Sequence, residues 1–156
     1  PFKIIIELDA EQIKSTDPVV DLVNVATNQL NLYGIHSELF TILSELYNNA
    51  LEHGILKLDS ALKQTDEGFF DFFTLREEKL VSLTDATIII SVDYRPRQSV
   101  LVIRMKDSGT GFKQQNMLEL DNVEKSYGRG ISLIKELCES VEYSNNGNTV
   151  DVVFKV

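Results

Sequence analysis

Two short segments of the chain carry side chains whose types and spacing suit the binding of a nucleotide and a metal ion. In the first, Glu45 and Asn49 are four residues apart, so on a helix they lie one turn apart on the same face. In the second, Asp107 ends an apolar run and is followed by Gly109 and Gly111, where the backbone can approach a ligand closely. An acid and an amide can serve a metal ion, and a buried carboxylate can accept a hydrogen bond from a base.

A third segment, Gly128, Arg129 and Gly130, stands just before a helical pattern that begins at Ile131. The N-terminus of a helix presents free backbone N–H groups and the positive end of the helix dipole, and both favour an anion. We therefore expect phosphates at this helix end, with Lys125 or Arg129 close enough to assist. The alternative is that both glycines are ordinary loop residues.

The three segments divide the roles that Mg²⁺ and ATP require. Mg²⁺ keeps several waters when bound, so the carbonyl oxygen of Asn49 together with phosphate oxygens is sufficient. Glu45 could orient or deprotonate an attacking hydroxyl group, and Asp107 could accept a hydrogen bond from the adenine amino group. His53 either contacts the metal shell or the substrate, or it caps helix carbonyls. Taken alone, each motif has an ordinary alternative, such as an exposed polar pair or an Asp-Ser-Gly turn.

The composition indicates a single cytoplasmic domain over residues 1–156. With 43% hydrophobic residues, a chain of this length can bury a core. Its 24 acidic and 15 basic residues give a formal charge of −9, which repels the backbone of nucleic acids. The only cysteine, Cys138, lies in an apolar helical pattern and fits a reducing compartment. No apolar run approaches the ~20 residues of a membrane span. The start at Pro1 rather than Met indicates a domain excised from a longer protein.

The hydrophobic pattern predicts helices that gather in the first half and strands that dominate the second. Helical spacing covers 18–32, 37–54, 66–83 and 131–140, and strand-like runs cover 2–8, 87–93, 100–106, 141–143 and 149–156. This order favours an α+β fold, a two-layer sandwich with a mixed, mostly antiparallel sheet and helices on one face. The polar, aperiodic segment 112–126 is predicted to be a lid over the site.

In their order, these segments resemble the N, G1 and G2 boxes of the Bergerat-fold ATPases, the superfamily of gyrase B and the histidine-kinase catalytic domain. The run from Asn49 to Gly54 is most similar to the serine kinases that serve bacterial anti-sigma factors. Histidine kinases usually have Asn where this chain has Glu45, which disfavours that branch. The resemblance implies Mg²⁺ and ATP as cofactors, Glu45 as the catalytic residue and Asn49 as the metal ligand. It also implies a nucleotide-binding set of Asn49, Asp107, Gly109, Gly111, Lys125, Gly128, Arg129 and Gly130.

An insertion of roughly thirty residues, 56–85, departs from the compact anti-sigma kinases. It is similar to the ATPase domain at the C-terminus of some bacterial response regulators, which also carry a receiver domain and a PP2C-type phosphatase. The resemblance implies a serine/threonine kinase that phosphorylates an anti-sigma factor antagonist in partner switching. The alternative is a nucleotide-gated module that sequesters a sigma factor or antagonist without significant kinase activity. A homodimer is a further possibility that the sequence does not decide.

The insertion contains four phenylalanines in five positions, between 69 and 73. Phe69, Phe70 and Phe73 are most simply interpreted as a core face, and contact with a partner is the alternative. The segment nevertheless holds more large apolar residues than one helix face against a small core needs. We therefore expect a subset of Phe69, Phe70, Phe72 and Phe73 to be exposed and to serve a partner more than ATP.

Overall fold

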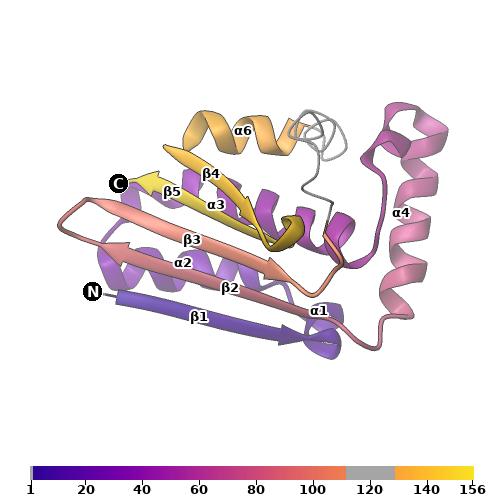
Figure 1. Ribbon diagram of the computed structural model, residues 1–156, viewed down its shortest axis with the longest axis horizontal. Helices are drawn as coiled ribbons and strands as arrows, with labels where there is room; N and C mark the ends of the chain where they lie inside the picture. The colour runs from indigo at the N-terminus through magenta and orange to yellow at the C-terminus, as the bar shows by residue number, and fades with distance from the viewer. Residues whose placement is uncertain (1, 112–128) are drawn as a thin grey trace.

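The computed structural model describes residues 2–111 and 129–156, and it consists of a sheet covered on one face by helices (Figure 1). The sheet has five strands in the order β1-β2-β3-β5-β4, and the pairing between each two neighbours is antiparallel. The strands are β1 (Phe2–Asp9), β2 (Thr87–Arg95), β3 (Val100–Asp107), β4 (Ser140–Ser144) and β5 (Thr149–Lys155). The predicted α+β sandwich is confirmed, and no parallel pair occurs among the described strands.

Helices α2, α3 and α6 form the second layer, whereas α4 stands beyond one end of the sheet (Figure 1). The α-helices are α1 (Ala10–Ser15), α2 (Pro18–Leu30), α3 (His36–Asn48), α4 (Asp66–Val81) and α6 (Arg129–Leu137). Single turns occupy Tyr33–Ile35, Ser60–Gln64 and Asn145–Gly147, and Asn49–Ile55 forms a wider π-helical segment. No helix in the described part of the chain is long and apolar enough to cross a membrane.

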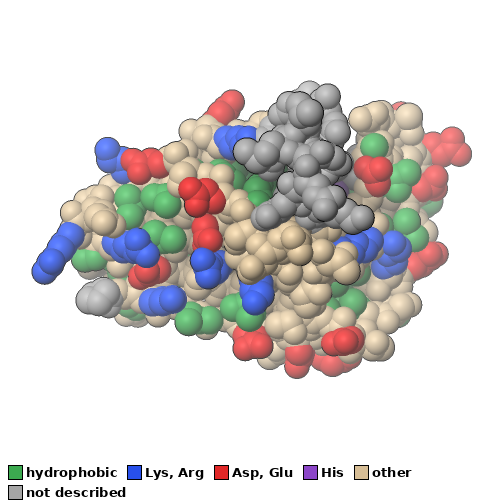
Figure 2. All heavy atoms as spheres, viewed as in Figure 1, with side chains coloured by type: hydrophobic (Ala, Val, Ile, Leu, Met, Phe, Trp, Pro, Cys, Tyr) green, Lys and Arg blue, Asp and Glu red, His purple; other side chains and the backbone are tan. Residues whose placement is uncertain are grey.

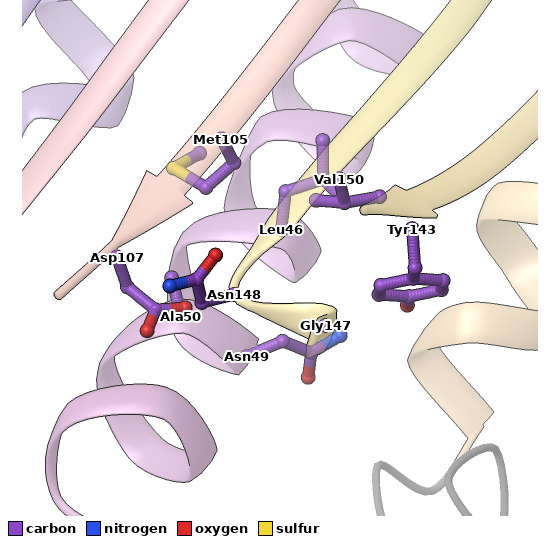
Figure 3. Close-up of a pocket in the computed structure, with 9 residues that line it drawn as sticks. All are labelled: Leu46, Asn49, Ala50, Met105, Asp107, Tyr143, Gly147, Asn148 and Val150. Atoms are coloured by element: carbon purple, nitrogen blue, oxygen red, sulfur yellow. The ribbon is translucent and has the colours of Figure 1, made fainter. Parts of the chain in front are cut away.

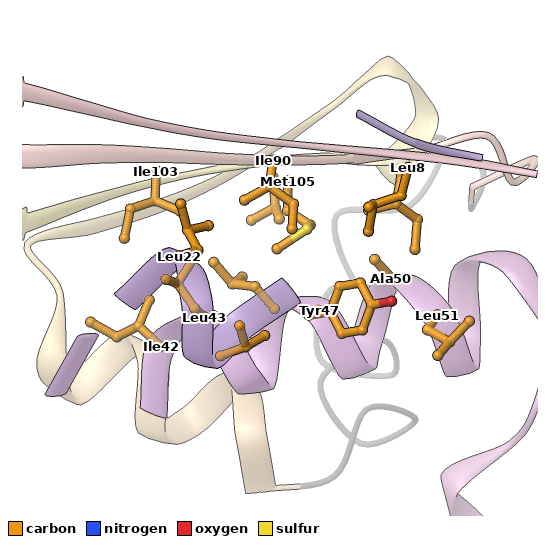
Figure 4. Packing of buried hydrophobic residues seen from close by; sticks show 14 of the residues in the cluster. Leu8, Leu22, Ile42, Leu43, Tyr47, Ala50, Leu51, Ile90, Ile103 and Met105 are labelled. Carbon is orange, nitrogen blue, oxygen red and sulfur yellow. The ribbon is translucent and has the colours of Figure 1, made fainter. Parts of the chain in front are cut away.

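The core lies between the sheet and the helix layer (Figure 4). Along β2 and β3 every second side chain points at the helices, which is the period of two expected for a sheet with one covered face. Ile90, Ile103 and Met105 from these strands are almost completely buried, as are Leu22 of α2 and Leu43 of α3. This packing fixes α3 against the strand that ends at Asp107, so the two main motifs are held in one rigid body.

Helix α4 meets the rest of the domain through a narrow strip of its surface. Phe72 is fully buried, whereas Phe69, Phe70 and Phe73 are 50%, 73% and 46% exposed. The interpretation of these three residues as a core face is therefore wrong, and the expected exposed subset is confirmed. The physical reason is helix geometry, since Phe72 and Arg76 share the face turned to the domain while Phe69 and Phe73 share a neighbouring one.

Candidate functional site

The helix α3 positions Glu45 and Asn49 one turn apart, as their spacing predicts. The backbone N–H of Asn49 donates to the carbonyl oxygens of Glu45 and Leu46, so the helical path continues through both residues. Both side chains are half-buried. The pair therefore lies one turn apart at the C-terminal end of α3.

After Asn49 the helix widens into a π-helical segment, where the sequence predicts an ordinary helix up to Gly54. The amide of Leu56 donates to the Leu51 carbonyl at 2.8 Å, a bond across five residues instead of four. The segment brings the backbone of Gly54 against the carboxylate of Asp107. A Cβ on Gly54 would lie 2.5 Å from Asp107 Oδ2, so only glycine permits this approach. The first and second motifs thus meet directly.

Asp107 is a buried carboxylate at the end of β3. It is 7% exposed, and it accepts a hydrogen bond from the Gly109 amide at 2.8 Å. Burial raises the pKa of Asp107 to about 6, against the opposing effects of the Gly109 amide and the Lys57 ammonium group. A carboxylate has about four acceptor positions. Asp107 can therefore accept a further hydrogen bond from a ligand.

A small cavity joins Asp107 to Asn49 (Figure 3). Asp107 and Asn148 lie on one side of it, the ring of Tyr143 lies on the other, and Asn49 lies near Gly147 between them. Leu46, Ala50, Met105 and Val150 supply the apolar part of the lining. The volume is about 20 Å³, room for a single water molecule, so an adenine ring requires the cavity to widen.

The sequence did not single out the residues that reach this cavity from β4, β5 and the turn between them. The Asn148 carbonyl accepts the Asp107 amide at 2.9 Å, and the Asn148 side chain donates to the Gly109 carbonyl at 3.3 Å. Gly111, with φ of 69°, lies so close to Asn146 that a Cβ would overlap its carbonyl oxygen. The polar run 145–148 between the last two strand-like segments is typical of a turn, and its amide side chains are the sequence signal that it also borders the site.

The third segment reaches the same site through the start of α6. A Cβ on Gly130 would overlap Glu45 Oε2, so the first turn of α6 lies directly against the Glu45 carboxylate. Arg129 begins the helix. Lys125, Gly128 and the predicted lid 112–126 lie outside the described residues. The acid of the first motif and the phosphate-favouring helix end of the third are thus neighbours.

Asn49 is the side chain best suited to a metal ion or phosphate. Its Nδ2 atom is buried and has no hydrogen-bond partner among the described residues. A buried unpaired donor costs on the order of 1–3 kcal/mol, a cost that a phosphate oxygen would remove. Within the same part of the chain, no three His, Cys, Asp or Glu side chains cluster as a metal site. The Nδ2 donor of Asn49 therefore fits a phosphate oxygen, and its Oδ1 oxygen could be one ligand of a cation held mainly by the phosphates.

The chain matches one protein-family model over most of its length. The model of the histidine kinase-like ATPase domain matches residues 14–154, nearly the whole chain. The chain belongs to the histidine kinase-like ATPase domain family. No curated protein matches it significantly. Members of this family are ATP-binding domains, which agrees with the buried acceptor of Asp107 and the helix end beside Glu45.

In this histidine kinase-like ATPase domain, the pKa of Glu45 depends first on burial and then on two charged neighbours, of which Lys63 comes from the insertion. Burial raises the pKa of Glu45, Lys63 lowers it, and Glu52 raises it again. A raised pKa makes a carboxylate a stronger base. The chain segment that carries Lys63 therefore contributes to the electrostatics of the site, although nothing in its sequence pattern indicated this.

Glu52 attaches the insertion to the π-helical segment that follows α3, a role that the sequence pattern does not indicate. It is 8% exposed, and it accepts a hydrogen bond from Arg76 Nε at 2.9 Å, with Lys63 Nζ at 3.6 Å. Nearby, the His53 ring nitrogen Nδ1 lies 2.6 Å from the Leu58 carbonyl oxygen, and burial lowers the pKa of His53. His53 thus contacts the loop that leads into the insertion.

Replacing Glu52 with glutamine is expected to lower the free energy of unfolding by about 1–3 kcal/mol, because two cations lose a largely buried partner. Urea unfolding of the variant and the wild type measures the change. Asp151→Asn is the matched control, since the Arg104–Asp151 pair has a shorter distance of 2.7 Å but an Arg104 side chain that is 58% exposed. The control should change stability by less than about 1 kcal/mol. Equal losses in both variants would contradict an anchoring role for Glu52.

Proposed function

We propose that this domain is a Mg·ATP-dependent serine/threonine protein kinase whose substrate is an anti-sigma factor antagonist. The observation that carries the proposal is the contact between Glu45 and the first turn of α6 at Gly130. It sets an acid with a raised pKa beside the helix end that favours phosphate. A domain that only binds ATP has no use for a base at that position.

The proposal gives each residue a separate task. Asp107 accepts a hydrogen bond from the adenine amino group, and Asn49 would hold the metal ion through its amide oxygen. Bound Mg²⁺ would neutralise charge on the phosphates. The phosphates bind at the start of α6, where Gly130 lies against Glu45, and Gly128 with Lys125 or Arg129 would assist.

Glu45 acts as the base in the proposed transfer. It takes the proton of the substrate serine hydroxyl as the oxygen of that serine bonds to the γ-phosphorus and ADP departs with the bridging oxygen. Catalysis would depend on positioning and charge stabilisation, without a covalent enzyme intermediate.

A second candidate function is supported by the exposed phenylalanines of α4. In this alternative, the domain sequesters a sigma factor or antagonist in a nucleotide-dependent manner and transfers little phosphate. The two functions differ in the role of Glu45, because sequestration needs nucleotide binding but no base.

The test is transfer of labelled γ-phosphate from ATP to antagonist proteins encoded near the gene. The kinase proposal expects one antagonist to become labelled on serine or threonine, with a label that survives acid. An acid-labile label would instead indicate transfer to histidine. Absence of label in an antagonist that nevertheless binds in the presence of ATP would support sequestration.

A further inference from the structure

Helix α4 presents an aromatic and acidic surface that the nucleotide site does not use. We name it the α4 surface and define it by its exposed residues Phe69, Phe70, Asp71, Phe73, Glu77 and Glu78. The rings of Phe69 and Phe73 pack edge to face, with centroids 4.8 Å apart. A shallow groove of about 500 Å³ is lined by Phe70, Phe73, Thr74, Arg76, Glu77 and Glu78. Figure 2 shows hydrophobic and acidic side chains together along the edge that α4 forms.

Both cations of α4 bond to the domain, and Arg76 also lines one side of the groove, so the carboxylates outnumber the cations on the outer surface. Arg76 donates to Glu52 at 2.9 Å, and Lys79 Nζ donates to the Leu56 carbonyl at 2.9 Å. Lys63 Nζ lies 4.3 Å from the centre of the buried Phe72 ring and 5.7 Å from the centre of the Phe73 ring. In the described part of the chain, the five exposed carboxylates of α4 form no ion pair: Asp66, Glu67, Asp71, Glu77 and Glu78.

The surface is also held in place before any partner arrives. Phe72 is fully buried, and Arg76 and Lys79 tie the middle and the end of the helix to the domain. Three large rings therefore stay exposed on a fixed helix. A preformed apolar groove loses little conformational entropy on binding, which favours affinity.

The charge of the α4 surface narrows the class of partner. A second copy of this chain would bring an identical acidic surface and a net charge of −9, so like charges would meet. Nucleic acid and anionic lipid are repelled for the same reason. A helix with apolar residues on one face and Lys or Arg on its flanks satisfies both the rings and the carboxylates.

We propose that the α4 surface is a docking site for a basic amphipathic helix of another protein. Apolar side chains of that helix lie in the groove along Phe70 and Phe73, and its cations pair with Asp71, Glu77 and Glu78. The proposal does not depend on kinase activity, because none of these residues reaches the nucleotide site. It names the partner by its chemistry, a helix of opposite charge with one apolar face.

The probe for this site is a fluorescent helical peptide of about 18 residues, with Leu at i, i+3, i+4 and i+7 spacing and Lys elsewhere. Binding to the whole domain is measured by anisotropy. The apolar test variant is Phe70→Ser with Phe73→Ser. Its matched control is Val20→Ser with Val25→Ser, because those α2 valines are 46% and 47% exposed. The test pair should raise the dissociation constant at least about tenfold and the control pair less than about twofold.

The carboxylates are tested with net charge held equal. Glu77→Gln with Glu78→Gln removes two charges from the α4 surface, whereas Glu7→Gln with Glu142→Gln removes two from exposed positions on the sheet. Only the first pair of substitutions is expected to weaken binding of the peptide and to reduce the salt dependence of that binding.

If the two glutamine pairs change the dissociation constant equally, the peptide is attracted to the acidic protein in general and the proposal is overturned. The same holds if the serine pair on α4 and its control pair on α2 have equal effects. Self-association that Phe70→Ser with Phe73→Ser abolishes, measured by sedimentation equilibrium, would overturn it in favour of a second copy. Circular dichroism confirms that each variant is folded. Because the ring of Phe73 also packs against the buried ring of Phe72, with centroids 5.5 Å apart, urea unfolding checks that the serine pair keeps the stability of the domain.

Discussion

Replacing Asp107 with asparagine is expected to make the nucleotide-free domain more stable and its binding of ATP weaker. The stability effect follows from burial, which raises the pKa of Asp107 from 3.8 to about 6. At neutral pH the folded state therefore holds a charge that water would solvate better. A difference of two pH units corresponds to on the order of 3 kcal/mol, and we expect asparagine to recover about 1–3 kcal/mol of it.

The pH dependence of this effect has a definite sign. Below about pH 4 the carboxyl group is protonated in both the folded and unfolded states, so the variant gains nothing. Between 3.8 and about 6 the unfolded chain releases the proton while the folded chain keeps it, and wild-type stability falls as pH rises. Above about pH 6 the folded wild type carries the full destabilisation that comes from its buried Asp107 charge. Urea unfolding at several pH values should show the variant's advantage growing through this window.

The binding effect has a different origin. Asparagine can still accept the Gly109 amide through its oxygen, but it places an NH₂ group where the second carboxylate oxygen stood. That group opposes the adenine amino donor. Loss of one such acceptor costs on the order of 1–3 kcal/mol, or roughly a 5- to 150-fold weaker affinity.

Calorimetric titration with ATP measures this loss of affinity. Asp85→Asn, at an exposed position before β2, is the matched control and should change neither stability nor affinity. A folded Asp107→Asn variant that binds ATP as tightly as the wild type would refute the adenine contact.

Replacing Glu45 with glutamine is expected to abolish most phosphate transfer and leave ATP binding nearly intact. Glutamine keeps the size of the side chain beside Gly130 but cannot take a proton. Loss of a general base typically costs 10²- to 10⁴-fold, on the order of 3–5 kcal/mol of transition-state stabilisation. Since the base acts mainly in the transition state, the ground-state affinity for ATP should be little changed.

Asn49→Ala separates metal binding from base catalysis. It removes the proposed metal ligand, so it should lower both ATP affinity and transfer. The Asn49 amide Nδ2 has no partner among the described residues, so this variant should not lose stability from a broken side-chain bond. Glu38→Gln, two turns before Glu45 on α3, serves as the control for both variants and should transfer at the wild-type rate.

The measurements are transfer of labelled phosphate to the antagonist and calorimetric affinity for ATP. Wild-type transfer by Glu45→Gln would show that Glu45 is not the base. Weaker ATP binding in Glu45→Gln than in Asn49→Ala would reverse the two assigned roles.

Features that depend on near neighbours along the chain could be predicted from the residue pattern. Alternation of apolar residues placed β2 and β3 to within two residues at either end. The spacing of Glu45 and Asn49 placed them on one helix face, because that relation is set by helix geometry alone. The same reasoning identified Asp107 at the end of a buried strand, where the alternation of the strand brought its side chain inward.

Which elements lie opposite one another became known from the folded chain. The approach of Gly54 to Asp107 and of Gly130 to Glu45 joins segments far apart in the chain, and no local period encodes such a meeting. Three further features also depend on contacts between distant segments. They are the ion pairs of Glu52, the presence of Tyr143 and Asn148 in the cavity lining, and the burial of Phe72 rather than Phe73. Periodicity fixes how side chains are arranged around one helix or strand. Which face is covered depends on the volume and charge that another part of the chain brings to it.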